Sequence, residues 1–87
     1  MNSKIFNGNN IRIDQVERGL QDAKKEGIFS IDYSKIRSFS EAFQEASEGK
    51  FQIAKYEVKG LISKVRSQCS ISSKDFDIIE KILMGDI

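Results

Sequence analysis

Apolar residues recur every three or four positions through most of the 87-residue chain, which is the spacing of one face of an α-helix. This pattern predicts four helices, over residues 15–26, 33–47, 51–68 and 73–84. Gly27, Gly49 and Gly85 follow three of these apolar stripes, and glycine readily adopts the left-handed conformation that ends a helix. The expected fold class is therefore all-α, a small bundle of about four short helices.

The last helix has the clearest boundary signals. Ser72 and Asp75 have the spacing of a capping box, in which each side chain accepts a hydrogen bond from a backbone N–H in the first turn. Ile71 and Phe76 stand at the two positions of a hydrophobic staple. The sequence thus predicts a helix that begins at about residue 73 and ends at Gly85.

The junction between the second and third helices leaves two interpretations. The apolar stripe of residues 51–68 is one residue out of phase with an extension of the second helix, so a break at Gly49 is expected. The alternative is a single 36-residue helix through Gly49 and Gly60. Such a helix would spread its apolar positions around the cylinder, which favours the break.

The first twelve residues differ from the rest of the chain. They contain four asparagines, and an Asn7–Gly8 pair stands between apolar residues. We expect residues 1–12 to form a flexible tail or a short hairpin with a type I′ turn, and the tail is favoured because an isolated hairpin is marginal in water. Residues 13–87 are expected to form a single helical domain, since the chain is too short for two.

Composition places the chain among packed proteins without strong affinity for phosphate. Hydrophobic residues make up 39% and charged residues 31%, while 14 Lys and Arg against 13 Asp and Glu leave a net charge of +1. So small a charge disfavours nucleic acid as a partner. The lone Cys69 cannot close an intrachain disulfide, and no apolar run approaches the roughly 20 residues of a membrane span. A cytoplasmic location without membrane contact is therefore expected.

Several chemistries lack the residues they need. The chain has no histidine, so Ser-His-Asp and Cys-His nucleophile arrangements are excluded, as is a tetrahedral zinc site of Cys and His ligands. The six glycines occur singly and form no phosphate-binding loop. Asp75, Asp77 and Glu80 are assigned to the start of the last helix, where acidic side chains stabilise the helix dipole. We expect no enzymatic activity, no cofactor, no metal and no small-molecule substrate.

A protein partner bound through amphipathic helices requires none of these groups. Apolar residues of the predicted helices and of the connection over residues 28–31 are the candidate partner-binding residues: Leu20, Phe29, Ile31, Ile36, Phe51 and Ile53. Lys55, Lys59 and Arg66 form a basic row on the third predicted helix, which is expected to be a solvated outer face. A DNA-reading helix-turn-helix from the last two helices is the alternative, although its reading helix would begin with acidic residues.

Part of the chain resembles a known family. Leu20, Ala23, the Glu26–Gly27 pair, Phe29, Ile31–Asp32 and Lys35–Ile36 are similar in order to the C-terminal stretch of bacterial flagellar anti-sigma factors. The resemblance implies a small regulator that wraps a sigma factor with short helices. In that family the stretch lies close to the C-terminus, whereas here some fifty residues follow it.

The sequence therefore predicts a non-enzymatic, helical protein–protein interaction module, a small regulator or adaptor that binds a larger protein partner, in an anti-sigma-like manner if the resemblance holds. Self-association is the other kind of protein contact expected. The alternative function is a small DNA-binding transcriptional regulator or antitoxin.

Overall fold

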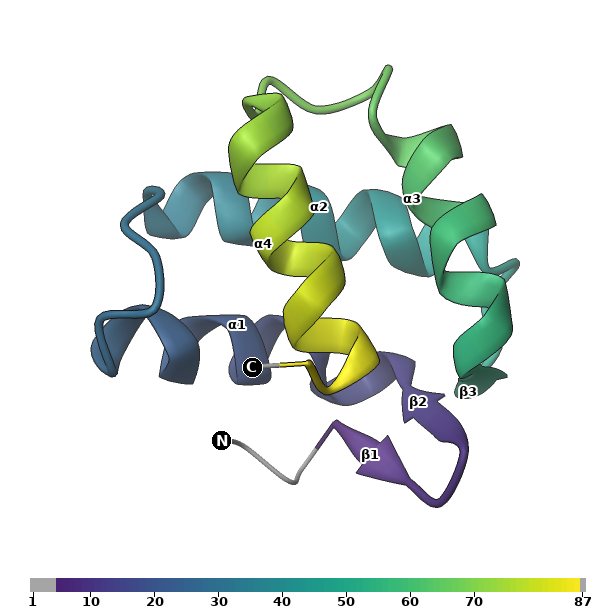
Figure 1. Ribbon diagram of the computed structural model, residues 1–87. Coiled ribbons are helices and arrows are strands. Elements are labelled where there is room, and N and C mark those ends of the chain that lie inside the picture. Colours follow the sequence, from purple (N-terminus) through teal and green to yellow (C-terminus); the bar gives the residue numbers. More distant parts are fainter. Residues whose placement is uncertain (1–4, 87) are drawn as a thin grey trace.

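A computed structural model describes residues 5–86 of the chain. Its four α-helices are α1 (Val16–Lys25), α2 (Tyr33–Ala46), α3 (Val58–Val65) and α4 (Ser73–Met84). Three short strands form one antiparallel sheet in the order β1 (Phe6–Asn7), β2 (Asn10–Arg12) and β3 (Gln52–Ala54). The 3₁₀ turns η1 (Ile13–Gln15) and η2 (Lys55–Glu57) lead from β2 into α1 and from β3 into α3. In Figure 1, α4 crosses in front of α2. Helices α1 and α3 lie on either side of α4, and the sheet closes one end of the molecule.

The chain is mostly helical but not purely all-α, so the expected fold class needs correction. The predicted helix over 51–68 begins instead with a strand and a 3₁₀ turn, and only Val58–Val65 is α-helical. The backbone around β3 pairs with the N-terminal segment: Ile13 N–H donates to the Phe51 carbonyl at 2.8 Å, and Lys55 N–H donates to the Asn9 carbonyl at 3.0 Å. These bonds compete directly with the helical ladder for the same groups.

The segment expected to be a tail or a hairpin forms a hairpin over residues 6–12. Asn7 pairs with Asn10 across the two-residue turn Gly8–Asn9. The backbone φ of Gly8 is 62°, whereas the φ of Asn9 is not positive. A positive φ at the first central position alone matches a type II′ turn rather than type I′. The hairpin is not isolated, because β2 also pairs with β3 and Ile5 and Ile11 are fully buried in the core.

The helix break near Gly49 is confirmed. Helix α2 ends at Ala46, and Glu48 and Gly49 follow with φ values of 59° and 77°. Two successive left-handed residues cannot continue a right-handed helix, so the single 36-residue helix is wrong. The bounds of α1, α2 and α4 lie within one residue of those expected, whereas α3 ends at Val65, three residues before the expected end.

The fold consists of two copies of one unit: a strand, a 3₁₀ turn and two helices. The first copy consists of β2, η1, α1 and α2, and the second consists of β3, η2, α3 and α4. Equivalent residues are 42 positions apart in the strand, the 3₁₀ turn and the first helix of each copy, and 40 positions apart in the second helix. Ile11 pairs with its own counterpart Ile53, as a local two-fold axis through that pair requires. The equivalent core residues are Ile11 and Ile53, Val16 and Val58, Leu20 and Ile62, Ala23 and Val65, Ile36 and Phe76, Phe39 and Ile79, and Phe43 and Leu83.

Aromatic side chains hold the two units together at the centre. The Phe39 ring stacks on Phe43 with centroids 5.4 Å apart and meets the edge of Phe76 on α4 at 6.2 Å. All three rings are at most 2% exposed. Because Phe39 and Phe76 come from different units, burial of these rings makes the folding of one unit depend on the other.

Candidate interaction face

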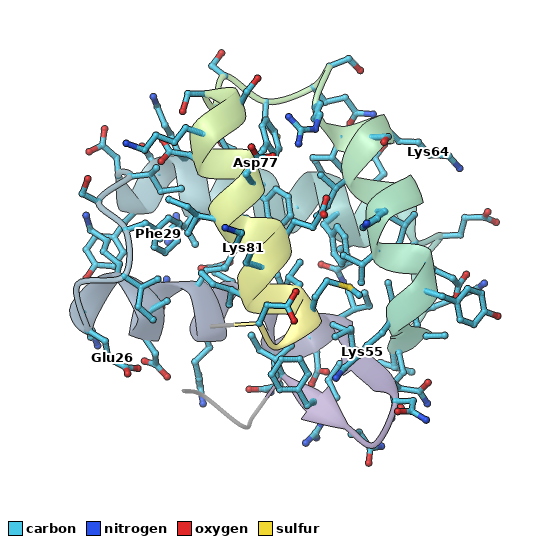
Figure 2. All side chains as sticks on the ribbon, in the orientation of Figure 1. Glu26, Phe29, Lys55, Lys64, Asp77 and Lys81 are labelled. Carbon is cyan, nitrogen blue, oxygen red and sulfur yellow. The ribbon has the colours of Figure 1, made fainter. Side chains whose placement is uncertain are left out.

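The structure places five of the six candidate partner-binding residues in the core. Leu20 and Ile36 are fully buried, and Phe29, Ile31 and Ile53 are between 4% and 7% exposed. In Figure 2, Phe29 points inward from the α1–α2 connection toward the centre of the molecule. These five side chains stabilise the folded chain and are covered by it, so a partner would not reach them on this surface.

Phe51 is the exception, with 81% of its surface exposed. It precedes β3, and its carbonyl is fixed by the Ile13 N–H, so the backbone that carries the ring is held by the sheet. Tyr56, in η2, is 86% exposed. Large aromatic side chains are usually buried, and exposed ones on a rigid backbone are typical of interaction sites.

Exposed lysines lie close to these two rings in the sequence: Lys50 precedes Phe51, and Lys59 and Lys64 follow Tyr56. Tyr56, Lys59, Ser63 and Lys64 are all exposed and recur at helical spacing, on the side of η2–α3 opposite the buried core residues of α3. Figure 2 shows Lys64 projecting outward from α3. We call the exposed set Lys50, Phe51, Tyr56, Lys59 and Lys64 the basic–aromatic face.

The acidic residue adjacent to Tyr56 in sequence, Glu57, is held at the edge of β3. Glu57 is the single acidic residue in η2 and α3, and its Oε2 accepts a hydrogen bond from Ala54 N–H at 3.0 Å. That bond caps the outer edge of β3, since Ala54 N–H does not take part in the ladder with β2. Lys59 and Lys64 therefore extend from a helix whose carboxylate is already engaged.

The basic row expected from the sequence is divided by the fold. The Lys55 ammonium lies 4.8 Å from the Phe6 ring centroid and close to the C-terminal end of α4, where a cation is favoured by the helix dipole (Figure 2). Arg66 lies 5.0 Å from the Phe76 ring centroid and donates to Asp77 at 3.1 Å. Of that row, only Lys59 belongs to the basic–aromatic face.

A hollow of about 660 Å³ lies between the α1–α2 connection and the start of α4. Its lining includes Lys24, Phe29, Tyr33, Lys74 and Asp75, and the Lys24 ammonium lies 5.2 Å from the Tyr33 ring centroid. Asp75 is the one carboxylate in the lining, which also contains no cysteine. This hollow thus offers no pair of carboxylates for general acid–base catalysis and no activated thiol.

The thiol of Cys69 lies elsewhere and is not activated. Partial burial raises its pKa above the ordinary value, and its Sγ donates to the Ser38 carbonyl at 3.7 Å. The neutral thiol therefore predominates near pH 7, where a reactive cysteine would need a lowered pKa.

The loop between α2 and α3 has about the length of the roughly 12-residue calcium-binding loop of an EF-hand. With Glu57 at loop position 12, the bidentate position, loop position 5 falls on Lys50 and position 6, which requires glycine, falls on Phe51. A lysine cannot ligate a cation, so the donor set does not fit. Across residues 5–86, no cluster of three or more Cys, Asp or Glu could hold a metal ion.

Two further findings bear on the class of protein. Residues 66–72 join α3 to α4, a longer connection than the roughly 3–4-residue turn of a helix-turn-helix. No helix in the described part of the chain has the length and apolar character needed to cross a membrane.

No protein-family model matches this chain, and neither does any curated protein or solved structure with which it was compared.

Proposed function

We propose that the chain is a non-enzymatic protein–protein interaction module, a small cytoplasmic regulator or adaptor that docks on a protein partner through the basic–aromatic face. The observation that carries the proposal is the exposure of Phe51 and Tyr56, at 81% and 86%, on backbone held by the sheet and α3. A partner that covers both rings and presents carboxylates to the lysines satisfies the apolar and the charged parts together.

The magnitudes suit a specific but moderate interaction. Each ring has roughly 150 Å² left to bury, which at about 25 cal/mol per Å² corresponds to about 4 kcal/mol. Association costs about 4–15 kcal/mol in lost rigid-body freedom, so the two rings together only offset that cost. Net affinity then depends on the lysines and on contacts around the rings.

Photo-crosslinking in the native cell tests this proposal. The photoreactive residue p-benzoyl-L-phenylalanine replaces Phe51 in one variant and Glu41, exposed on α2, in a matched control. We expect a discrete crosslinked protein from position 51 that disappears when Tyr56→Ala is added, and none from position 41. Equal capture from both positions, or capture unaffected by Tyr56→Ala, would contradict a docking role for this face. A sigma factor among the captured proteins would support the anti-sigma-like form of the proposal.

Nucleic-acid binding is the second candidate, because aromatic and basic side chains alternate on the face as they do in single-strand-binding surfaces. Retention on single-stranded and duplex DNA in rising salt tests it. Binding that weakens steeply with salt and is lost in Lys59→Glu would favour this candidate over a protein partner.

A further inference from the structure

The outer side of η1 and α1 is the structural counterpart of the Tyr56–Lys59–Lys64 part of the basic–aromatic face, and it carries acidic residues at the equivalent positions. The internal repeat matches Tyr56 with Asp14 and Lys59 with Glu17. It also matches Lys64 with Asp22. Residues 14–25 hold three acidic residues, Asp14, Glu17 and Asp22, and three basic ones, Arg18, Lys24 and Lys25. The acidic residues stand at the positions equivalent to Tyr56, Lys59 and Lys64, so the two segments carry complementary side chains at these three positions.

The α1 side is also hollowed where the α3 side projects. A depression of about 230 Å³ is lined by Asp14, Glu17, Arg18 and Gln21. The Glu17 carboxylate accepts from the Gln21 amide at 3.2 Å and lies 3.9 Å from the Arg37 Nε, yet the Glu17 side chain remains 37% exposed. Its position is thus fixed while part of its surface is open to a cation.

The lining suits the side chains of the basic–aromatic face. Asp14 and Glu17 supply carboxylates for a lysine ammonium. The Arg18 guanidinium is a planar cation of the kind that stacks on a tyrosine ring. Lys59 and Tyr56 are one helical turn apart, so a single approach can bring both into this depression.

From this complementarity we infer that the partner is a second copy of this chain, whose acidic depression on α1 receives Tyr56 and Lys59 of the first. The inference rests on the proposed function, since it uses the same basic–aromatic face. The contact joins two different surfaces, so each pair leaves one face of each kind free, and the association is head-to-tail. It grows into rings or open chains as concentration rises.

Sedimentation velocity of the full chain with charge-reversed variants tests the inference. The average mass of the natural protein should rise with concentration and fall as salt is raised. Lys59→Glu or Glu17→Lys alone should weaken association at least tenfold. A 1:1 mixture of these two variants should associate again, because Lys59 of one meets Glu17 of the other. Glu41→Lys makes the same charge change on α2 and should leave the association of the otherwise natural chain unchanged.

Circular dichroism of each variant checks folding, and Asp14→Lys replaces Glu17→Lys if the latter does not fold. A natural protein that stays monomeric at all concentrations would overturn the inference, as would a mixture that fails to associate. If it is monomeric while the crosslinker at position 51 captures another protein, the proposed function stands and self-association falls. If no protein, including a second copy, is captured, both fall.

Discussion

Phe29 and Phe51 were both expected to contact a partner, and truncating each should separate folding from binding. Phe29 is 6% exposed, so Phe29→Ala removes nearly the whole ring from the core; at roughly 190 Å² and about 25 cal/mol per Å², this costs about 5 kcal/mol. Phe51 is 81% exposed, and the remaining fifth of its surface, roughly 40 Å², corresponds to about 1 kcal/mol or less.

Domains of this size are stable by about 4–13 kcal/mol, so the first substitution removes much of that margin and the second very little. Urea denaturation followed by circular dichroism at 222 nm measures both. We expect Phe29→Ala to lower the unfolding free energy by about 5 kcal/mol, which unfolds the chain if its stability lies at the lower end of that range. Phe51→Ala should lower it by about 1 kcal/mol or less.

Binding should show the opposite order. Phe51→Ala should weaken capture of the partner at least tenfold while the fold persists, and Phe29→Ala should affect capture only through loss of folded protein. Comparable loss of stability in both variants would refute the assignment of Phe51 to a docking face. An unchanged unfolding free energy in Phe29→Ala would refute the assignment of that ring to the core.

Three further substitutions and one titration follow from local geometry. Gly60 lies inside α3 with nothing within 4 Å of an added Cβ, so Gly60→Ala should stabilise the chain by about 1 kcal/mol in thermal melts, whereas Gly49→Ala, at a φ of 77°, should destabilise it by about 1–2 kcal/mol. The Ser40 hydroxyl is buried without a hydrogen-bond partner, and Ser40→Ala should therefore raise the unfolding free energy by about 1 kcal/mol. Burial raises the pKa of Cys69, so alkylation by iodoacetamide should begin at a higher pH in the folded chain than in the urea-unfolded chain. The same shift adds a small stability to the folded chain below the ordinary thiol pKa, and this stability is lost as the pH rises above it. Equal alkylation profiles would contradict that direction.

Features that are local in sequence could be predicted. Helix α4 has the expected bounds because its signals lie within a few residues: Ser72 Oγ accepts from Asp75 N–H at 3.2 Å, and Gly85 takes a φ of 78°. The sheet could not be predicted in the same way. Its strands are two or three residues long, and β3 pairs with a segment about 42 positions away, so Ile53 fits a helical stripe as well as a strand.

Most of the candidate partner-binding residues lie in the core, because the same apolar pattern marks core faces and partner-binding faces alike. Apolar residues at helical spacing identify a face that must be covered, but not whether the same chain or a partner covers it. Phe51 was found by this reasoning, while Tyr56 and Lys64 were missed. Alignment of residues 10–25 with 52–67 would have provided a signal, since it places Tyr56 and Lys64 opposite Asp14 and Asp22.

Because the fold consists of two units, the peptide link near Gly49 acts mainly by keeping the two units close to each other. Each unit supplies one strand of the β2–β3 pair and one ring of the Phe39–Phe76 contact, so either unit alone would leave its apolar side uncovered. A chain split at Gly49 should consequently reassemble from two co-expressed pieces, with a dissociation constant that reflects the lost millimolar effective concentration. Such a split would make the chain a reporter whose signal depends on bringing two fused proteins together.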